Sequence, residues 1–253
     1  MFDPADLSDD GFLGGRLRLL QPKAGYRAAT DPVLLAAAVP ARAGENALEL
    51  GCGAGAAALC LAARVPGLAV TGLERQPAYA ALARENAARN GLALTVIEGD
   101  LAHLPAALRE RSFDHVLANP PYYPAGGGTA ARDPGREAAL REETPLAVWV
   151  ETAARRLRPR GVLTAIQAAD RLPELLAACE GRLGSLVVLP LAPRAGRPAG
   201  RVLLRAVKGG RAAFRLLAPV VLHEGVAHDG DRDSYSALAQ AVLRGGAELP
   251  LTP

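Results

Sequence analysis

Four consecutive residues, Asn119, Pro120, Pro121 and Tyr122, carry the strongest chemical signal in this chain of 253 residues. They follow an apolar run at 113–118 that is typical of a buried strand. An amino group conjugated to a ring is a poor nucleophile because its lone pair is delocalised. If the Asn119 side-chain oxygen and the Pro120 carbonyl accept its two N–H hydrogens, the nitrogen is drawn toward tetrahedral geometry. The tetrapeptide therefore predicts a site that prepares a planar amine for attack without a strong general base.

The other parts of the tetrapeptide suit a rigid binding slot. Pro120 and Pro121 restrict the backbone, so the two acceptors would be in place before a substrate arrives. Tyr122 offers an aromatic face on which an extruded base can stack. A proline-rich strand exit without a function is the alternative interpretation. We take all four residues as candidate catalytic residues.

A glycine-rich turn upstream supplies the second signal. Gly51, Gly53 and Gly55 fall at every second position, with Cys52 between the first two and Glu49 before them. Gly51 permits a sharp turn, Gly53 lets the backbone approach a ligand, and Gly55 allows close packing of a helix. The dinucleotide fingerprint spaces its last two glycines three apart. This spacing argues against a nicotinamide oxidoreductase and leaves a nucleoside cofactor of another kind.

Two acids follow the next predicted strands. Glu74 closes the run at 69–73, where doubly wound nucleoside-binding folds place an acid on the ribose hydroxyls, and Arg75 stands beside it. Asp100 follows the run at 94–97 and suits the cap of a helix that would begin at Leu101. We expect Glu74 and its neighbour Arg75 to border the cofactor.

The elements that would position these residues follow a β-α-β pattern. Helical patterns alternate with short apolar runs at 47–50, 69–73, 94–97, 115–118 and 162–166. This alternation is typical of a parallel sheet with helices on both faces. Runs at 186–190 and 202–207 are separated by a segment rich in proline and glycine, which predicts an antiparallel edge. The fold class is therefore α/β, with a doubly wound, mostly parallel sheet and an antiparallel edge strand.

Several helix boundaries are marked by their residue types. Pro77 suits a first turn, and Asn90 with Gly91 suits a helix end. Thr144 followed by Pro145 predicts a cap and a first helical position.

The two motifs resemble those of a known enzyme class. The turn at 49–55 resembles the first motif of class I S-adenosylmethionine-dependent methyltransferases, and the tetrapeptide matches the Asn-Pro-Pro-Tyr motif of those that methylate amino groups. The resemblance implies a seven-stranded, Rossmann-like sheet and S-adenosylmethionine as cofactor. It also implies that Glu49 lies near the methionyl end of that cofactor and that Asp100 bonds its adenine amino group.

Further segments, at 20–35, 207–210 and 221–225, resemble the bacterial tRNA (adenine-N6) methyltransferase family that acts on valine tRNA. This resemblance implies methyl transfer to an exocyclic amino nitrogen, adenine N6, with a tRNA as partner. It implies that Lys23, Tyr26, Thr30 and Asp31 line the methionyl side of the cofactor or the mouth of the acceptor pocket. The alternative for Thr30 and Asp31 is a helix cap.

Other functions stay open at this point. Glutamine methylation of a release factor and guanine-N2 methylation of ribosomal RNA would use the same tetrapeptide, and a non-catalytic adaptor would keep only the fold. The pair Ala28 and Ala29 departs from the bulkier or polar pair of the family and leaves the acceptor open. Fewer than fifty residues precede the run at 47–50, which is short for a separate recognition domain. We expect residues 1–45 to cap a catalytic domain of residues 46–253.

Composition restricts the class of protein. The chain is 50% hydrophobic and 22% charged, as globular proteins are. Its net charge is only +3, but 27 of its 29 basic residues are arginines, which favours contact with phosphate or carboxylate without requiring it. The acidic residues 1–10 lack a secretion-signal pattern and no apolar run has membrane-spanning length, so we expect a cytoplasmic location without a membrane partner. Cys52, Cys60 and Cys179 lack metal-ligand spacing and are expected to be buried hydrophobes.

Two irregular stretches, at 124–136 and 228–233, suit either substrate-handling loops or plain connectors. Arg132, Arg136 and Arg141 are candidates for contact with an RNA backbone, or for a solvated face. The pair His223 and His228 has the wrong spacing for a zinc helix, so no metal site is expected.

Overall fold

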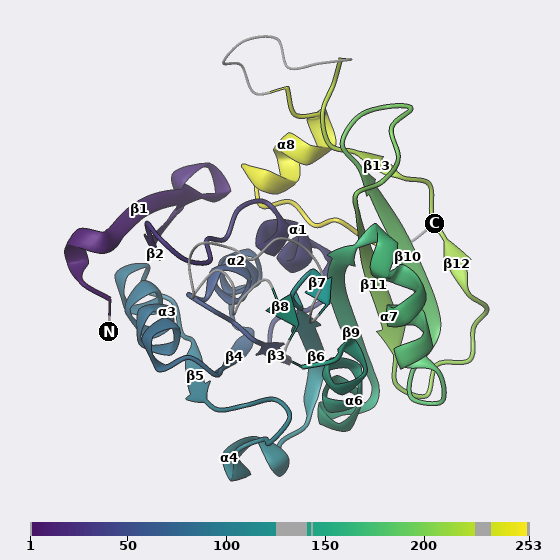
Figure 1. Ribbon diagram of the computed structural model, residues 1–253, viewed down its shortest axis with the longest axis horizontal. Helices are drawn as coiled ribbons and strands as arrows, with labels where there is room; N and C mark the ends of the chain where they lie inside the picture. The colour runs from purple at the N-terminus through teal and green to yellow at the C-terminus, as the bar shows by residue number, and fades with distance from the viewer. Residues whose placement is uncertain (1, 125–140, 143, 226–233, 252–253) are drawn as a thin grey trace.

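The computed structural model describes residues 2–124, 141–142, 144–225 and 234–251. Its centre is one nine-stranded sheet (Figure 1), made of β3 (Asn46–Leu50), β4 (Ala69–Glu74), β5 (Thr95–Glu98), β6 (Phe113–Ala118), β9 (Leu157–Ala168), β10 (Gly184–Ala192), β11 (Arg201–Val207), β12 (Arg215–Leu216) and β13 (Val220–Val221). The strand order is β12-β10-β11-β9-β6-β3-β4-β5, and β13 also pairs with β10. The seven longer strands are those expected from the sequence, and the two-residue strands β12 and β13 are additions.

The pairing confirms a mostly parallel sheet. Strands β5, β4, β3, β6 and β9 are parallel neighbours, whereas β11 is antiparallel to both β9 and β10. The antiparallel strand therefore lies between β9 and β10, two places inside the edge formed by β12. The α/β fold class predicted from the sequence is confirmed.

Helices cover both faces of the sheet (Figure 1). They are α1 (Asp31–Ala38), α2 (Ala56–Arg64), α3 (Pro77–Arg89), α4 (Ala106–Arg109), α6 (Leu146–Arg156), α7 (Leu172–Cys179) and α8 (Ala237–Leu243). The short 3-10 turns are η1 (Pro4–Asp6), η2 (Leu13–Gly15) and η3 (Ala169–Arg171). One core cluster joins α1, α2 and α8 to one face, and a second joins α4, α6 and α7 to the other. Alternate strand residues, such as Ala47 and Leu48, belong to different clusters, as period-two geometry requires.

Most of the predicted helix boundaries are confirmed. Pro77 opens α3, and Asn90 and Gly91 follow its last turn, with Gly91 at a φ of 62°. The expected cap of α6 is shifted by one residue: Pro145, and not Thr144, occupies the cap position, and no side chain bonds the first turn there. Cys52, Cys60 and Cys179 are free and buried, as expected.

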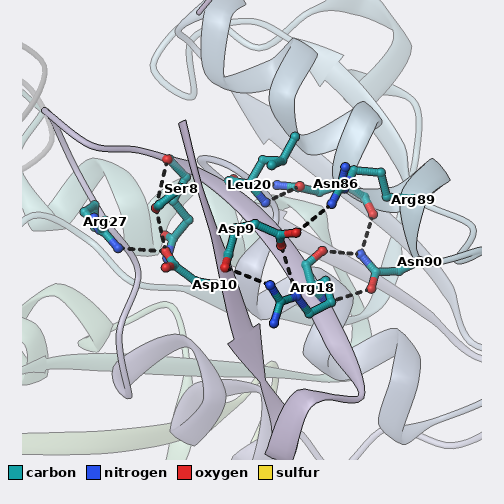
Figure 2. A network of polar contacts seen from close by, with 10 residues as sticks. Ser8, Asp9, Asp10, Arg18, Leu20, Arg27, Asn86, Arg89 and Asn90 are labelled. Atoms are coloured by element: carbon teal, nitrogen blue, oxygen red, sulfur yellow. Dashed lines mark hydrogen bonds and ion pairs between the residues drawn. The ribbon is translucent and has the colours of Figure 1, made fainter. Parts of the chain in front are cut away.

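An N-terminal hairpin docks on α3 through side-chain amides (Figure 2); its strands are β1 (Leu7–Phe12) and β2 (Leu17–Pro22). Asn86 Oδ1 accepts from Leu20 N at 2.7 Å, and its Nδ2 donates to Leu20 O at 3.0 Å. One helical turn later, Asn90 bonds the N–H and the carbonyl of Arg18 at 2.9 and 2.8 Å. The two amides thus occupy the free edge of β2 in place of a neighbouring strand. This contact fixes where the chain leaves β2 for the loop that borders the site.

Of the two irregular stretches at 124–136 and 228–233, the structure describes only Pro124. Residues 125–140 and 226–233, which include Arg132, Arg136 and His228, lie outside the described residues. Tyr123–Pro124 (β7) and Arg141–Glu142 (β8) form a short parallel pair on either side of the first of these gaps. Within the described ranges, no helix is long and apolar enough to cross a membrane, and no group of three or more His, Cys, Asp or Glu side chains gathers as metal ligands do.

Candidate active site

The two predicted motifs meet at one cavity of about 280 Å³ at the carboxyl ends of β3, β4 and β6. The parallel register places Leu50 beside both Leu73 and Ala118, so the turns that follow these three residues are neighbours. Thirteen of the predicted site residues line the cavity: Tyr26, Asp31, Glu49, Gly51, Cys52, Gly53, Glu74, Arg75, Asp100, Asn119, Pro120, Pro121 and Tyr122.

Three predicted site residues do not line the cavity. Lys23 turns toward the N-terminal segment, where Nζ donates to Ala5 O at 2.7 Å. Thr30 precedes α1 at its cap position. Gly55 precedes α2 at a φ of 87°, and a Cβ there would lie 3.3 Å from the Cβ of Ala83. Gly55 therefore allows close helix packing, which is the role that the glycine spacing predicted.

The turn after β3 requires glycine at two positions. Gly51 has a φ of 65°, and a Cβ on it would lie 2.7 Å from Trp149 Cη2. Gly53 has a φ of 53°, and its N–H donates to Glu74 Oε2 at 2.9 Å. Trp149 is held in turn by a hydrogen bond from Nε1 to Thr144 O at 3.2 Å. The indole of α6 therefore supports the floor of the cavity, a role that sequence reasoning missed.

Two buried carboxyl groups stand side by side in the cavity wall. Glu49 is only 3% exposed and accepts from Ala58 N at 2.8 Å. Burial, together with the charge of Glu74, raises the pKa of Glu49 to about 8. Burial also raises the pKa of Glu74, against the opposing effect of N–H donors from Gly53 and Gln76. A cation placed beside Glu49 would restore its charged form, and Glu74 keeps acceptor positions for two hydroxyls.

Asp100 forms a turn and not a helix cap. Its Oδ1 accepts from Ala102 N at 2.8 Å, and its backbone bridges to His103. The alternative of a helix starting at Leu101 is therefore wrong, because the chain there forms a turn and α4 begins only at 106. The side chain still borders the cavity.

The Asn119 amide is only half satisfied. Its Nδ2 donates to the phenolic oxygen of Tyr26 at 3.3 Å, while its Oδ1 is buried without a partner among the described residues. Tyr26 is fixed through its backbone, since its N–H donates to Tyr79 Oη at 2.9 Å and its carbonyl accepts from the same hydroxyl at 3.2 Å. Burial, and then the charge of Glu49, raises the pKa of Tyr26 to about 12. A buried, unpaired oxygen lowers stability, so its presence here fits an acceptor that a ligand N–H completes.

The backbone of the tetrapeptide is held from β9 and η3. Gln167 is fully buried, and its Nε2 donates to Pro120 O at 3.4 Å and to Pro121 O at 3.3 Å. Arg171 adds a donor to Pro121 O at 3.3 Å. Sequence reasoning missed both residues, although Gln167 directly follows the apolar run at 162–166, at the edge of the sheet where the site was expected.

The remaining residue of the tetrapeptide is tied to the start of α1. Tyr122 Oη donates to Asp31 Oδ2 at 2.6 Å, and Asp31 Oδ1 pairs with Arg201 at the start of β11. Asp31 therefore belongs to the acceptor side of the cavity. Arg201 is a further residue that sequence reasoning missed.

This fold and this site define a class I S-adenosylmethionine-dependent methyltransferase. The chain belongs to the methyltransferase small domain family, whose family model matches residues 29–178. S-adenosylmethionine is accordingly its methyl donor.

Known proteins of several kinds are similar to this chain. A tRNA1(Val) (adenine(37)-N6)-methyltransferase of Dickeya chrysanthemi is 30% identical over 94% of this chain and 94% of its own length. The solved structure of a predicted O-methyltransferase from Agrobacterium tumefaciens has a TM-score of 0.70 and 30% identity, over 87% of this chain and 98% of that one. A release factor glutamine methyltransferase of Geobacter sulfurreducens is 38% identical, but over only 36% of this chain and 31% of its own length.

The cavity fits this cofactor on two observations. When bound, S-adenosylmethionine supplies a methyl group activated by a positively charged sulfur. Glu49 offers a buried carboxyl group without a cationic partner in the described structure, which suits a positive ligand. Gly51 and Gly53 leave backbone exposed to the cavity where any Cβ would intrude or strain the turn.

Proposed function

We propose that this protein transfers a methyl group from S-adenosylmethionine to the N6 amino group of an adenine in a tRNA. The observation that carries the choice of a nitrogen acceptor is the buried Oδ1 of Asn119, which has no partner in the described structure. Asn119 lines the same cavity as Pro120 and Tyr122. The name of the relative from Dickeya chrysanthemi, which matches almost end to end, supports a tRNA as the substrate.

In this proposal the acceptor amine is held by two oxygens. Asn119 Oδ1 accepts one N–H and the Pro120 carbonyl accepts the other. The carbonyl can do so while Gln167 occupies one of its lone pairs, because a carbonyl oxygen has two. The nitrogen lone pair then turns away from the ring and toward the methyl group. As the nitrogen–carbon bond forms, the carbon–sulfur bond breaks and its electron pair stays on the sulfur, which leaves as a neutral thioether. The methylated nitrogen then releases one proton to solvent, so no strong base is needed.

The cofactor residues divide by the part of the cofactor that they would hold. Glu49 would face the methionyl end, Glu74 the ribose hydroxyls and Asp100 the adenine amino group. The turn of Gly51, Cys52 and Gly53 would pass close to the nucleoside part of the cofactor. Arg75 and Tyr26 would lie at the rim of this part of the cavity. Lys23, Thr30 and Gly55 do not line the cavity and would support the cofactor-binding segments from behind.

We further propose that residues 1–45 form an extension of a catalytic domain made of residues 46–253. The docking of the hairpin on α3 and the contact between Tyr26 and Asn119 support this division. We propose the cytoplasm, where tRNA resides, as the place of action.

The test separates the polymers. The protein is incubated with labelled S-adenosylmethionine and with separate tRNA, ribosomal RNA and protein fractions, and each labelled fraction is digested to monomers. We expect the label in N6-methyladenosine from tRNA. Label in N5-methylglutamine from protein, or in N2-methylguanosine from ribosomal RNA, would contradict the proposal.

A further inference from the structure

Tyr122, Asp31 and Arg201 come together from three separate elements. Tyr122 lies between β6 and β7, Asp31 is the first residue of α1, and Arg201 is the first residue of β11. Tyr122 Oη donates to Asp31 Oδ2 at 2.6 Å, and the Arg201 guanidinium donates to Asp31 Oδ1. The Asp31 side chain is only 16% exposed, so water competes weakly for these bonds.

A carboxylate is the group that this junction requires. It accepts from the phenol with one oxygen and from the guanidinium with the other, whereas an amide at position 31 would have one oxygen for both donors. Arg201 also neutralises the negative charge that Asp31 brings into the cavity wall. Burial raises the pKa of Tyr122, which keeps its hydroxyl protonated and able to donate.

The junction rests on rigid parts of the fold. Six of the other residues of α1 are buried hydrophobes in the core shared with α2 and α8, and the seventh, Pro32, is buried at the first turn. Arg201 pairs in register with Ala168 of β9. Asp31 therefore holds the hydroxyl of Tyr122 at a fixed point, which keeps the side chain from swinging away and fixes the position of the aromatic ring.

We propose that Asp31, held by Arg201, is a positioning residue that fixes where the Tyr122 ring lies for stacking with the acceptor base. The inference rests on the proposed function, because it assigns this ring to a flat acceptor. It differs from the expectation drawn from the resemblance, in which Asp31 lines the methionyl side of the cofactor or the mouth of the pocket. Its effect reaches the substrate through the Tyr122 hydroxyl alone.

The test is a double-mutant cycle on the full chain. Tyr122→Phe, Asp31→Ala and the double variant are compared with the unmodified protein for kcat/KM on the polymer that the fraction experiment labels. We expect each single change to lower kcat/KM about tenfold, as the loss of one charge-assisted hydrogen bond does. In the Tyr122→Phe background, Asp31→Ala should change kcat/KM less than about twofold. Arg201→Lys, which keeps the charge, should retain most of the activity.

Two outcomes would overturn the inference. The same loss from Asp31→Ala in both backgrounds would mean that Asp31 acts independently of Tyr122. A matching rise in the cofactor Kd, measured calorimetrically without RNA, would mean that Asp31 holds the cofactor. Asp9→Ala is the control, because Asp9 pairs with Arg18 of the hairpin at 3.2 Å and with Arg89 of α3 at 3.0 Å, outside the cavity lining.

A failure of the proposed function can be told apart from a failure of this inference. If tRNA is not methylated, the proposed substrate is wrong, and the cycle is run on whichever polymer carries the label. The coupling between Asp31 and Tyr122 is also measured by thermal unfolding without any substrate. Additive shifts in Tm would show that the two residues do not interact, whatever the acceptor.

Discussion

Asn119 donates from Nδ2 to the phenolic oxygen of Tyr26 at 3.3 Å, and this contact decides which end of the amide faces an acceptor. Tyr26 belongs to the loop after β2, outside the matched residues 29–178 of the family model. Gln21 fastens the same loop, since its amide bonds both the N–H and the carbonyl of Ala28 at 2.7 and 3.1 Å. The N-terminal segment therefore takes part in orienting the residue on which the proposed chemistry depends.

Tyr26→Phe should lower turnover with little effect on cofactor affinity. The ring and its packing remain, but Asn119 loses the oxygen that holds its Nδ2, so the amide can rotate and present a donor where an acceptor is needed. We expect kcat to fall about tenfold, as for loss of one hydrogen bond in a buried site. Steady-state kinetics and calorimetric titration with S-adenosylmethionine measure the two effects separately. An unchanged kcat would show that Tyr26 does not orient Asn119.

Glu49 should make both stability and cofactor binding depend on pH. Its pKa of about 8 in the folded protein lies above the ordinary value near 4.5, so the folded state holds a proton that the unfolded state has lost. The free energy of unfolding of the cofactor-free protein should therefore decrease as pH rises from about 5 to about 8, by up to about 1.4 kcal/mol per pH unit. Chemical denaturation at a series of pH values measures this slope.

Cofactor affinity should change in the opposite direction. A positive ligand favours the charged form of Glu49, so binding releases a proton and strengthens as pH rises through the same window. Calorimetry in buffers with different ionisation enthalpies measures the proton released. Glu49→Gln should weaken both dependences and leave the part due to Glu74, whose pKa burial also raises. A Gln variant with the same proton release as the unmodified protein would contradict this account.

Gly51→Ala should destabilise the protein and impair cofactor binding together. The new Cβ would meet Trp149 Cη2 at 2.7 Å, and the positive φ adds a backbone cost of about 1–2 kcal/mol. Trp149→Leu in the same chain should relieve the collision but not the backbone strain. Thermal unfolding should therefore recover only in part in the double variant. A full recovery would show that the left-handed backbone at Gly51 carries no cost.

Gln167→Leu should lower turnover because the Pro120 and Pro121 carbonyls lose their shared donor. We also expect a loss of stability of about 1–3 kcal/mol, since the Pro120 carbonyl would be left unsatisfied, whereas the Pro121 carbonyl keeps the donor from Arg171. Thr164→Val, on the same strand, is the matched control: Thr164 is buried and its hydroxyl has no partner among the described residues. The Thr164→Val variant should keep its turnover, and its free energy of unfolding should be unchanged or higher. Equal losses of turnover in the two variants would show that Gln167 has no special role.

Local patterns were enough to predict much of this structure. The apolar runs predicted the seven longer strands of the sheet. The spacing of Gly51, Gly53 and Gly55 predicted the turn after β3 and the close packing of the helix that follows it. The motif acids Glu49 and Glu74 both line the cavity, because residues at the ends of neighbouring parallel strands lie at one edge of the sheet.

The parts that the sequence did not reveal depend on contacts between distant segments. Gln167, Arg201 and Trp149 carry no motif, and their roles exist only because β9, β11 and α6 pack beside the tetrapeptide. The place of β11 inside the edge is likewise set by pairing across the sheet, which strand patterns alone do not determine. Lys23 does not line the cavity for the same reason, since its partner is the carbonyl of Ala5.

The most direct test compares the unmodified protein with Asn119→Ala, measuring S-adenosylmethionine affinity by calorimetry and methyl transfer to tRNA in parallel. The buried Oδ1 of Asn119 is assigned to the acceptor amine, so the account predicts a cofactor Kd within about twofold of the original and a loss of methyl transfer of at least about a hundredfold. Methyl transfer at the original rate, or loss of cofactor binding in place of transfer, would contradict it.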